Sequence, residues 1–277
     1  MTILENAYAK INLYLDVVGR REDGFHDIKS LMHTITLCDT IRLITSYSDN
    51  GRISLNSNIA TLENDENNLI YKSALKYTQK FGINDNIDVE LTKRIPIGAG
   101  LGGGSADAAA TLRAMNKIYG LASDDQMLEM AAEIGSDVPF CLVGGCAVCT
   151  GRGERVRPVS YDFPQKNVVI AIGESRVSTP KAYAMLDEKF GNFADHNKET
   201  EFDDSSIAIG YNIFESVIDI SEIDEIKRIM KENNAESALM SGSGPSVFGI
   251  YSSEVVAQKT VMELEKRGFW AFNCKLI

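Results

Sequence analysis

The feature that most constrains this chain is a glycine-rich stretch at residues 96–106, Pro-Ile-Gly-Ala-Gly-Leu-Gly-Gly-Gly-Ser-Ala. Glycine loses more backbone entropy on folding than any other residue, so such a dense run needs a compensating role. One such role is to let backbone N–H groups approach a bulky anion, in front of a helix whose N-terminus adds partial positive charge. The stretch therefore predicts a cradle for a triphosphate. It would be formed by Pro96, Ile97, Gly98, Ala99, Gly100, Leu101, Gly102, Gly103, Gly104, Ser105 and Ala106. Ser105 either contributes to the cradle or caps the helix behind it.

The composition limits the classes of function. With 277 residues, 44% of them hydrophobic and 24% charged, the chain has room for one or two globular domains. The net charge of −11 disfavours a nucleic-acid partner, because nucleic-acid binders carry basic patches. Neither a signal-peptide pattern nor a run of about 18 apolar residues occurs, so we expect a cytoplasmic protein with no membrane partner. The acidic segment from Asp187 to Asp204 is predicted to be a solvated loop.

The cysteines do not predict a metal site. There are five of them, and in the cytoplasm their thiols are expected to be reduced. The spacing Cys146-x-x-Cys149 occurs in zinc sites and redox pairs, but a zinc site needs a second pair of ligands at suitable spacing, and none accompanies it. We therefore interpret both cysteines as apolar residues of a strand.

Hydrophobic periodicity predicts a mixture of strands and helices. Residues 6–18 alternate, with Lys10 and Asn12 on the polar face, which indicates a half-buried strand. Further strands are expected at 30–37, 40–45, 52–56, 87–91, 145–150, 154–159, 168–172, 238–240, 246–251 and 269–276. Helices are expected at 68–81, 105–119, 123–135, 180–186, 212–218, 223–231 and 254–267. No long series of parallel β-α-β units appears, which favours the α+β class. A boundary near residues 158–166 predicts domains at 1–160 and 161–277.

Three common phosphate-binding loops do not fit the glycine stretch. A P-loop requires a lysine after its glycines, and none follows here. Gly98, Gly100 and Gly103 satisfy the dinucleotide-binding pattern literally. That fingerprint also needs an acidic residue closing a second strand about 20 residues later, where this chain opens a helix instead. The H-R-D and D-F-G motifs of protein kinases are absent.

The stretch resembles the ATP loop of the GHMP kinases, which include galactokinase, homoserine kinase, mevalonate kinase and phosphomevalonate kinase. Residues 9–13 (Ala-Lys-Ile-Asn-Leu) resemble the first motif of this family, and residues 240–245 (Met-Ser-Gly-Ser-Gly-Pro) resemble the third, a loop that supports the ATP loop. The resemblance implies a two-domain fold, with an N-terminal ATP domain like ribosomal protein S5 and a C-terminal ferredoxin-like domain. Residues 19–26, 135–139 and 177–180 resemble one branch of the family more closely. Members of that branch phosphorylate a cytidine-diphosphate-linked sugar alcohol in non-mevalonate isoprenoid biosynthesis.

The resemblance also implies roles for two charged residues. Asp137 matches the general base that takes the proton of the attacking hydroxyl. Lys10 matches a lysine that keeps this carboxylate ionised and steadies charge near the transferred phosphoryl group. From the pattern alone, Asp137 is a turn residue and Lys10 a solvated strand residue.

The acceptor site is implied at four positions. Phe25 and His26 match the pair that holds the cytosine, the aromatic ring by stacking and the histidine through its hydrogen-bonding edge. Phe25 stands where the family commonly has tyrosine; stacking needs only the ring face and survives the change. Tyr183 matches a second stacking aromatic, and Asn12 matches a residue near the transferred group.

The implied activity is an ATP- and Mg²⁺-dependent kinase acting on a small molecule, as a monomer or homodimer. No protein carboxylate stands out as a metal ligand, so the nucleotide and water are expected to hold the Mg²⁺. Two alternatives stay open at this point. One is another small-molecule GHMP kinase, such as homoserine or mevalonate kinase, and the other is a nucleotide-binding regulator without catalysis.

Overall fold

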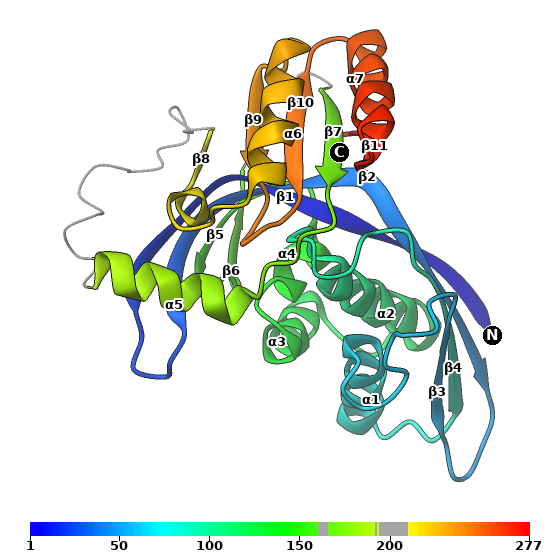
Figure 1. The fold of residues 1–277 in the computed structure, drawn as a ribbon. Helices are drawn as coiled ribbons and strands as arrows, with labels where there is room; N and C mark the ends of the chain where they lie inside the picture. The colour runs from blue at the N-terminus through cyan, green and yellow to red at the C-terminus, as the bar shows by residue number, and fades with distance from the viewer. Residues whose placement is uncertain (160–165, 192, 194–209) are drawn as a thin grey trace. The chain divides into compact units, whose positions relative to one another are not determined.

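The computed structural model describes residues 1–159, 166–191, 193 and 210–277 (Figure 1), and these form two compact units. Unit 1 consists of Met1–Ala9, Cys38–Ile97 and Gly102–Val143, and unit 2 consists of Lys10–Leu37, Gly98–Leu101 and Gly144–Ile277. The chain therefore passes more than once between the units. The predicted domain boundary falls largely on residues 160–165, which lie outside the described residues, and the division at residue 160 stays a prediction.

Unit 1 combines strands with a group of helices. Its strands are β3 (Ile53–Ser57), β4 (Asn86–Thr92), the end of β2 (His26–Ser46) and the start of β1 (Thr2–Arg20). β4 pairs with β3 in parallel and with β2 antiparallel. The helices are α1 (Leu69–Phe81), α2 (Gly103–Tyr119), α3 (Asp124–Ile134) and α4 (Val138–Val143). α2 packs against the other three helices, and its buried alanines allow this close approach.

Unit 2 contains the rest of β1 and β2 and a second sheet. β2 pairs antiparallel with β5 (Cys146–Gly151), β5 with β6 (Arg155–Pro158), and β1 pairs in parallel with β8 (Tyr211–Asn212). The second sheet has the order β11-β7-β10-β9. Its strands are β7 (Asn167–Ile172), β9 (Ser237–Met240), β10 (Val247–Tyr251) and β11 (Trp270–Lys275). Their pairing is antiparallel throughout.

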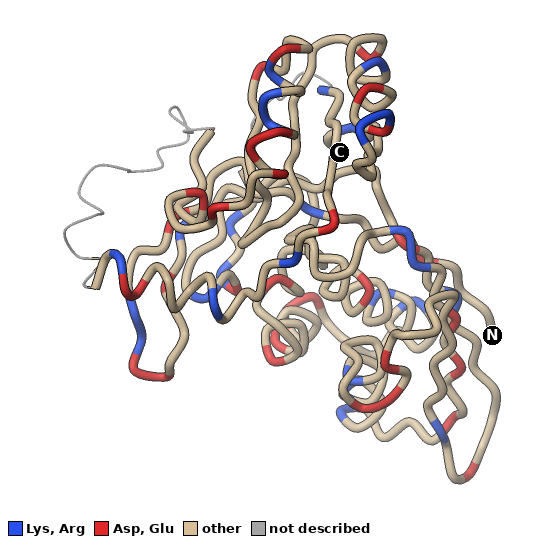
Figure 2. The backbone as a smooth tube through the Cα atoms, in the orientation of Figure 1, with Lys and Arg blue, Asp and Glu red and all other residues tan. Residues whose placement is uncertain are grey.

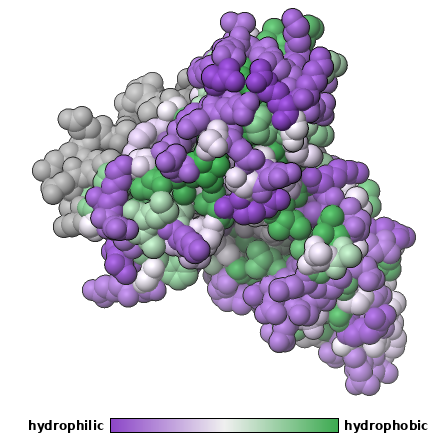
Figure 3. Space-filling model, viewed as in Figure 1, coloured by the Kyte–Doolittle hydropathy of each residue, from purple (hydrophilic) through white to green (hydrophobic). Residues whose placement is uncertain are grey.

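Three helices complete unit 2. α6 (Ser221–Glu232) and α7 (Glu254–Lys266) pack on the second sheet, and α5 (Thr179–Phe190) follows β7 (Figure 1). α6 buries Ile223, Ile226 and Ile229 at helical spacing. The surface of α6 and α7 visible in Figure 3 is mainly hydrophilic, and Figure 2 shows acidic and basic residues interspersed along both helices. Within the described part of the chain, no helix is both long enough and apolar enough to cross a bilayer.

The α+β class and most of the predicted elements are confirmed, including the capping box of Ser123 and Gln126 at the start of α3. Three predictions are wrong. Residues 30–37 and 40–45 belong to one strand, β2. Residues 212–218 form no α-helix, because Asn212 pairs in β8 and only a 3₁₀ turn (Ile213–Ser216) follows. The polar face of β1 is not solvated, since Lys10 is 4% exposed and Asn12 is 1% exposed.

Candidate active site

The glycine stretch leads directly into the first turn of α2. Gly100 and Gly102 have φ angles of +77° and +67°, in the left-handed region that favours glycine. Gly102 is the N-cap residue, so α2 begins at Gly103 and the predicted capping role of Ser105 is wrong. Because the first N–H groups of a helix have no partner within it, this turn offers donors and a partial positive charge to an anion.

A serine-containing loop of unit 2, residues 241–246 between β9 and β10, supports the glycine stretch, as predicted. Ser241 Oγ donates to the Gly100 carbonyl over 3.0 Å, and Ser246 Oγ donates to the Ala99 carbonyl over 2.5 Å. A Cβ atom added at Gly100 would lie 2.1 Å from the Ser241 carbonyl oxygen. Contact this close leaves no room for a side chain, so glycine is required at position 100.

Lys10 and Asn12 belong to the same buried network of unit 2. Lys10 Nζ donates to Asn12 Oδ1 over 2.7 Å, and that oxygen also accepts from the Gly242 N–H over 3.0 Å. Asn12 Nδ2 donates to Ser30 Oγ over 2.8 Å. The Lys10 N–H donates to the Leu101 carbonyl over 3.0 Å. The two predicted site residues on β1 therefore bond to both loops: Lys10 to the glycine stretch and Asn12 to the serine-containing loop.

Asp137 lies in unit 1, in the turn between α3 and α4, as the sequence predicted. It is half-buried, and its carbonyl accepts the Cys141 N–H over 3.1 Å, in the first turn of α4. A carboxylate between two helices is held on a rigid turn, which suits a group whose position matters for proton transfer.

The predicted base-binding residues gather in unit 2. The His26 side chain is 7% exposed, and its ring stacks on Tyr183 with centroids 4.6 Å apart. Phe25 is 51% exposed, and the Arg152 guanidinium lies 5.0 Å from its ring centroid. The structure therefore brings His26 and Tyr183 together, while Phe25, the neighbour of His26 in the chain, offers an accessible ring.

The sequence reasoning missed two residues of this region, Arg152 and Asp187. The charge pattern predicts a solvated loop at Asp187, which is wrong: Asp187 lies on α5, where its Oδ1 atom is 2.7 Å from His26 Nε2. The spacing in the sequence could have indicated this position. Asp187 follows Tyr183 by four residues, and residues four apart lie on the same face of a helix. Residues 194–204 of the acidic segment lie outside the described residues.

A buried charged cluster was also missed, beneath the first turns of α2 in unit 1. Lys93 Nζ donates over 2.5 Å to both Asp39 Oδ2 and Asp107 Oδ2, and Asp39 Oδ1 accepts the N–H groups of Arg94 and Ile95. Asp107 Oδ1 is buried and has no hydrogen-bond partner among the described residues. Burial raises the pKa of Asp107 to about 8, against the opposing attraction of Lys93.

The residues present fit a metal held by its nucleotide. Among the described residues, no three histidine, cysteine or acidic side chains cluster as metal ligands, and Cys146 and Cys149 lie in β5 without a disulfide. Mg²⁺ commonly keeps several waters and binds through substrate phosphates. The N–H groups in the first turn of α2 are donors of the kind that phosphate oxygens accept from.

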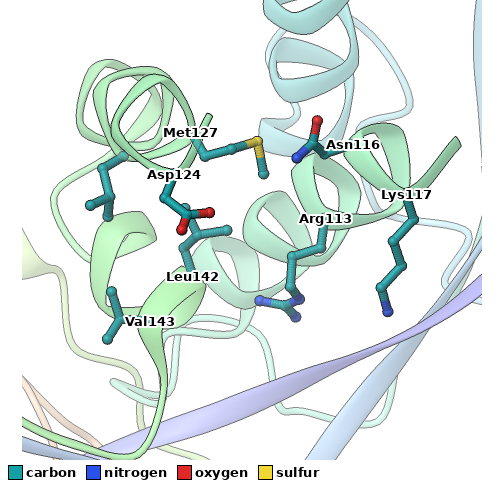
Figure 4. Close-up of a pocket in the computed structure, with 8 residues that line it drawn as sticks. Arg113, Asn116, Lys117, Asp124, Met127, Leu142 and Val143 are labelled. Carbon is teal, nitrogen blue, oxygen red and sulfur yellow. The ribbon is translucent and has the colours of Figure 1, made fainter. Parts of the chain in front are cut away.

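Unit 1 also contains a cavity of about 460 Å³ between α2, α3 and α4 (Figure 4). Arg113 and Lys117 project from the same side of α2, and Met127 and Leu142 supply apolar walls. The Arg113 guanidinium donates to the carbonyls of Cys141 and Asn6. None of the predicted site residues lines this cavity.

Comparison with known proteins places these features in a family. The model of the GHMP kinases N terminal domain matches residues 68–145, and that of the GHMP kinases C terminal domain matches residues 214–268. A 4-diphosphocytidyl-2-C-methyl-D-erythritol kinase of Exiguobacterium sibiricum is 41% identical, over 97% of this chain and 95% of the relative. A kinase of the same name from Caldicellulosiruptor saccharolyticus is 39% identical, over 94% of this chain and 91% of the relative.

Solved structures agree with this assignment. The crystal structure of a 4-(cytidine 5'-diphospho)-2C-methyl-D-erythritol kinase is 30% identical, with a TM-score of 0.78, over 99% of both chains. The homoserine kinase of Cytophaga hutchinsonii is 21% identical, with a TM-score of 0.73, over 100% of this chain and 94% of that one, and shares the fold. With the glycine cradle, its supporting loop and near-full-length relatives in agreement, this chain belongs to the GHMP kinase family.

Proposed function

We propose that this chain transfers the γ-phosphoryl group of ATP to the 2-hydroxyl of 4-diphosphocytidyl-2-C-methyl-D-erythritol, in non-mevalonate isoprenoid biosynthesis. The observation that carries the proposal is the 41% identity to a kinase of that name over 97% of the chain. The homoserine and mevalonate kinase alternatives share the fold at 21% and 16% identity, so nothing favours their substrates here.

The glycine stretch binds the ATP in this proposal. The N–H groups of the stretch and of the first turn of α2 bind the triphosphate, and the positive end of the helix favours its charge. Ser241 and Ser246 hold the backbone of the stretch through the carbonyls of Gly100 and Ala99. When bound, Mg²⁺ offsets negative charge on the phosphate oxygens.

The acceptor end is assigned to the residues that the family resemblance implies. Asp137 orients the 2-hydroxyl and takes its proton as the oxygen attacks the γ-phosphorus. Lys10 offsets negative charge on the transferred group, and Asn12, which accepts from Lys10 Nζ, holds that ammonium in place. Phe25 and Tyr183 supply ring faces for the cytosine, and His26 contacts its polar edge. Because phosphoryl transfer needs little covalent chemistry from the protein, catalysis rests mainly on this positioning and on electrostatics.

A substrate panel tests the proposal. ADP release is measured with ATP, Mg²⁺ and one acceptor at a time: 4-diphosphocytidyl-2-C-methyl-D-erythritol, homoserine or mevalonate. We expect turnover with the cytidyl compound alone. ATP binding in a calorimeter without ADP release from any of the three acceptors would instead support a non-catalytic nucleotide-binding regulator.

A further inference from the structure

The imidazole of His26 is held on several sides within unit 2. Tyr183 stacks on one face, with an interplanar angle of 24°, and Phe193 meets the ring edge-on at a centroid distance of 5.9 Å. Asp187 Oδ1 lies 2.7 Å from Nε2, and the other oxygen of Asp187 lies 3.8 Å from the Arg20 guanidinium. The ring therefore has one orientation, fixed by packing and by one polar contact.

The contact with Asp187 determines which ring nitrogen carries the proton. A carboxylate oxygen accepts hydrogen bonds, so His26 Nε2 must donate its N–H to Asp187. In a neutral imidazole the other nitrogen, Nδ1, then presents a lone pair and acts as an acceptor. Nδ1 has no hydrogen-bond partner within the described part of the chain.

An acceptor at this position distinguishes two pyrimidines that share size and shape. Cytosine carries an exocyclic amino group, a donor, where uracil carries a carbonyl oxygen, an acceptor. An accepting Nδ1 would pair with the amino group of cytosine, whereas the carbonyl oxygen of uracil would place a second lone pair against it. A buried polar group left unpaired in this way is costly, so such a site can reject the mismatched ligand strongly.

We propose that Asp187 is the positioning residue that sets cytosine specificity, by fixing the tautomer in which His26 Nδ1 accepts from the cytosine amino group. This inference rests on the proposed function, since it assumes a cytidine-diphosphate-linked acceptor. Asp187 acts through His26 and does not touch the reacting atoms.

The first test compares Asp187→Asn with the wild-type enzyme on the cytidyl acceptor and on its uridine analogue. The side-chain amide that this substitution introduces keeps one acceptor oxygen but adds an N–H donor, so the imidazole proton is no longer confined to Nε2. Where the amide donates to Nε2, the proton lies on Nδ1 and that nitrogen becomes a donor. We expect KM for the cytidyl acceptor to rise about tenfold, because one hydrogen bond between His26 Nδ1 and the cytosine is lost. The preference for cytidine over uridine, as a ratio of kcat/KM values, falls by about the same factor or more. The kcat for the cytidyl acceptor and KM for ATP stay close to wild type.

Two matched variants separate this role from a loss of charge or of structure. Glu188→Gln removes the same charge one residue further along α5 and should leave the preference unchanged. Asp187→Glu keeps a carboxylate acceptor and should retain the preference even if KM rises. An unchanged cytidine-to-uridine ratio in a folded Asp187→Asn protein whose His26 carries its proton on Nδ1, as read by the nitrogen NMR described below, would overturn the inference. If the wild-type enzyme does not turn over the cytidyl acceptor at all, it is the proposed function that fails.

A second measurement needs no variant at position 187. Nitrogen NMR of the wild-type protein, labelled at its three histidines, reports the tautomer of each ring, and a His26→Gln variant assigns the signals. We expect a protonated Nε2 and an unprotonated Nδ1 for His26. His33 gives the opposite pattern as an internal reference, because its Nδ1 donates to the Thr34 carbonyl over 2.9 Å. A neutral His26 ring that carries its single proton on Nδ1 would contradict the inference.

Discussion

Replacing Gly100 by alanine tests the contact between the glycine stretch and the serine-containing loop. A Cβ at position 100 would lie 2.1 Å from the Ser241 carbonyl oxygen, whereas real Cβ contacts stay beyond 3.0 Å. One of the two backbones must move, which costs about 1–3 kcal/mol by analogy with overpacked cores. The left-handed φ of +77° adds about 1–2 kcal/mol for any residue with a side chain.

Gly98→Ala is the matched control, because Gly98 has a φ of +69° and open space around its Cβ position. It carries the backbone cost alone, about 1–2 kcal/mol. We therefore expect Gly100→Ala to lose about 2–5 kcal/mol in total, a fall in Tm of roughly 5–15 °C. Gly98→Ala should fall by about 2–6 °C.

Thermal unfolding followed by circular dichroism, together with KM for ATP, provides the assay. Gly100→Ala should also raise KM for ATP, because the N–H groups of the stretch are displaced with the backbone. Equal losses of stability in the two variants would refute the steric argument, since both share the left-handed cost and only Gly100 approaches Ser241.

Four further predictions concern the acceptor, the base and the buried cluster. Phe25→Ala should raise KM for the cytidyl acceptor about 5- to 150-fold, the worth of one base–aromatic stack, and leave KM for ATP unchanged in steady-state assays. Asp137→Asn should abolish turnover while calorimetry still detects ATP binding, because the cradle does not involve this carboxylate. Asp39→Ala should lower the free energy of unfolding by about 3–5 kcal/mol in urea titrations. The substitution removes the carboxylate that accepts hydrogen bonds from Lys93 and from the N–H groups of Arg94 and Ile95. Asp107→Asn should instead flatten the dependence of stability on pH.

The sign of that pH dependence follows from the raised pKa of Asp107. Its pKa is about 8 in the folded protein and 3.8 in the reference state, so the folded protein binds more protons between these values. Stability linked to this group is therefore present below pH 3.8 and is lost as the pH rises toward 8. Asp107→Asn removes this loss. Equal slopes of Tm against pH in wild type and Asp107→Asn would contradict the raised pKa of Asp107. Retained turnover in Asp137→Asn would contradict the role of Asp137 as general base. An unaltered KM for the cytidyl acceptor in Phe25→Ala would contradict stacking of Phe25 on the cytosine.

Local patterns predicted most of the elements and the glycine cradle, but not what covers β1. The alternation of residues 6–18 indicates a strand, yet it cannot show that Lys10 and Asn12 are buried. That burial comes from partners far along the chain, among them Ser30 and the N–H of Gly242. The same distance in sequence explains the wrong helix at 212–218. The Asn212 amide donates to the carbonyls of Met240 and Gly242, contacts that no local periodicity reports.

The acceptor site shows the same limit. Phe25, His26 and Tyr183 were predicted from a resemblance, and their roles stay predictions. Asp187 was overlooked because charge counting over residues 187–204 treats its carboxylate as one of many in a solvated segment. Its contact with His26 spans 161 positions, which only the folded chain reveals.

The position of the transferred phosphoryl group is the most direct test of the proposed function. Purified enzyme is incubated with ATP, Mg²⁺ and 4-diphosphocytidyl-2-C-methyl-D-erythritol, and the product is identified by phosphorus NMR and mass spectrometry. We predict one new phosphate monoester on the 2-hydroxyl, formed in equal amount to ADP. A phosphate on another hydroxyl, or ADP formed without any phosphorylated acceptor, would contradict the assignment.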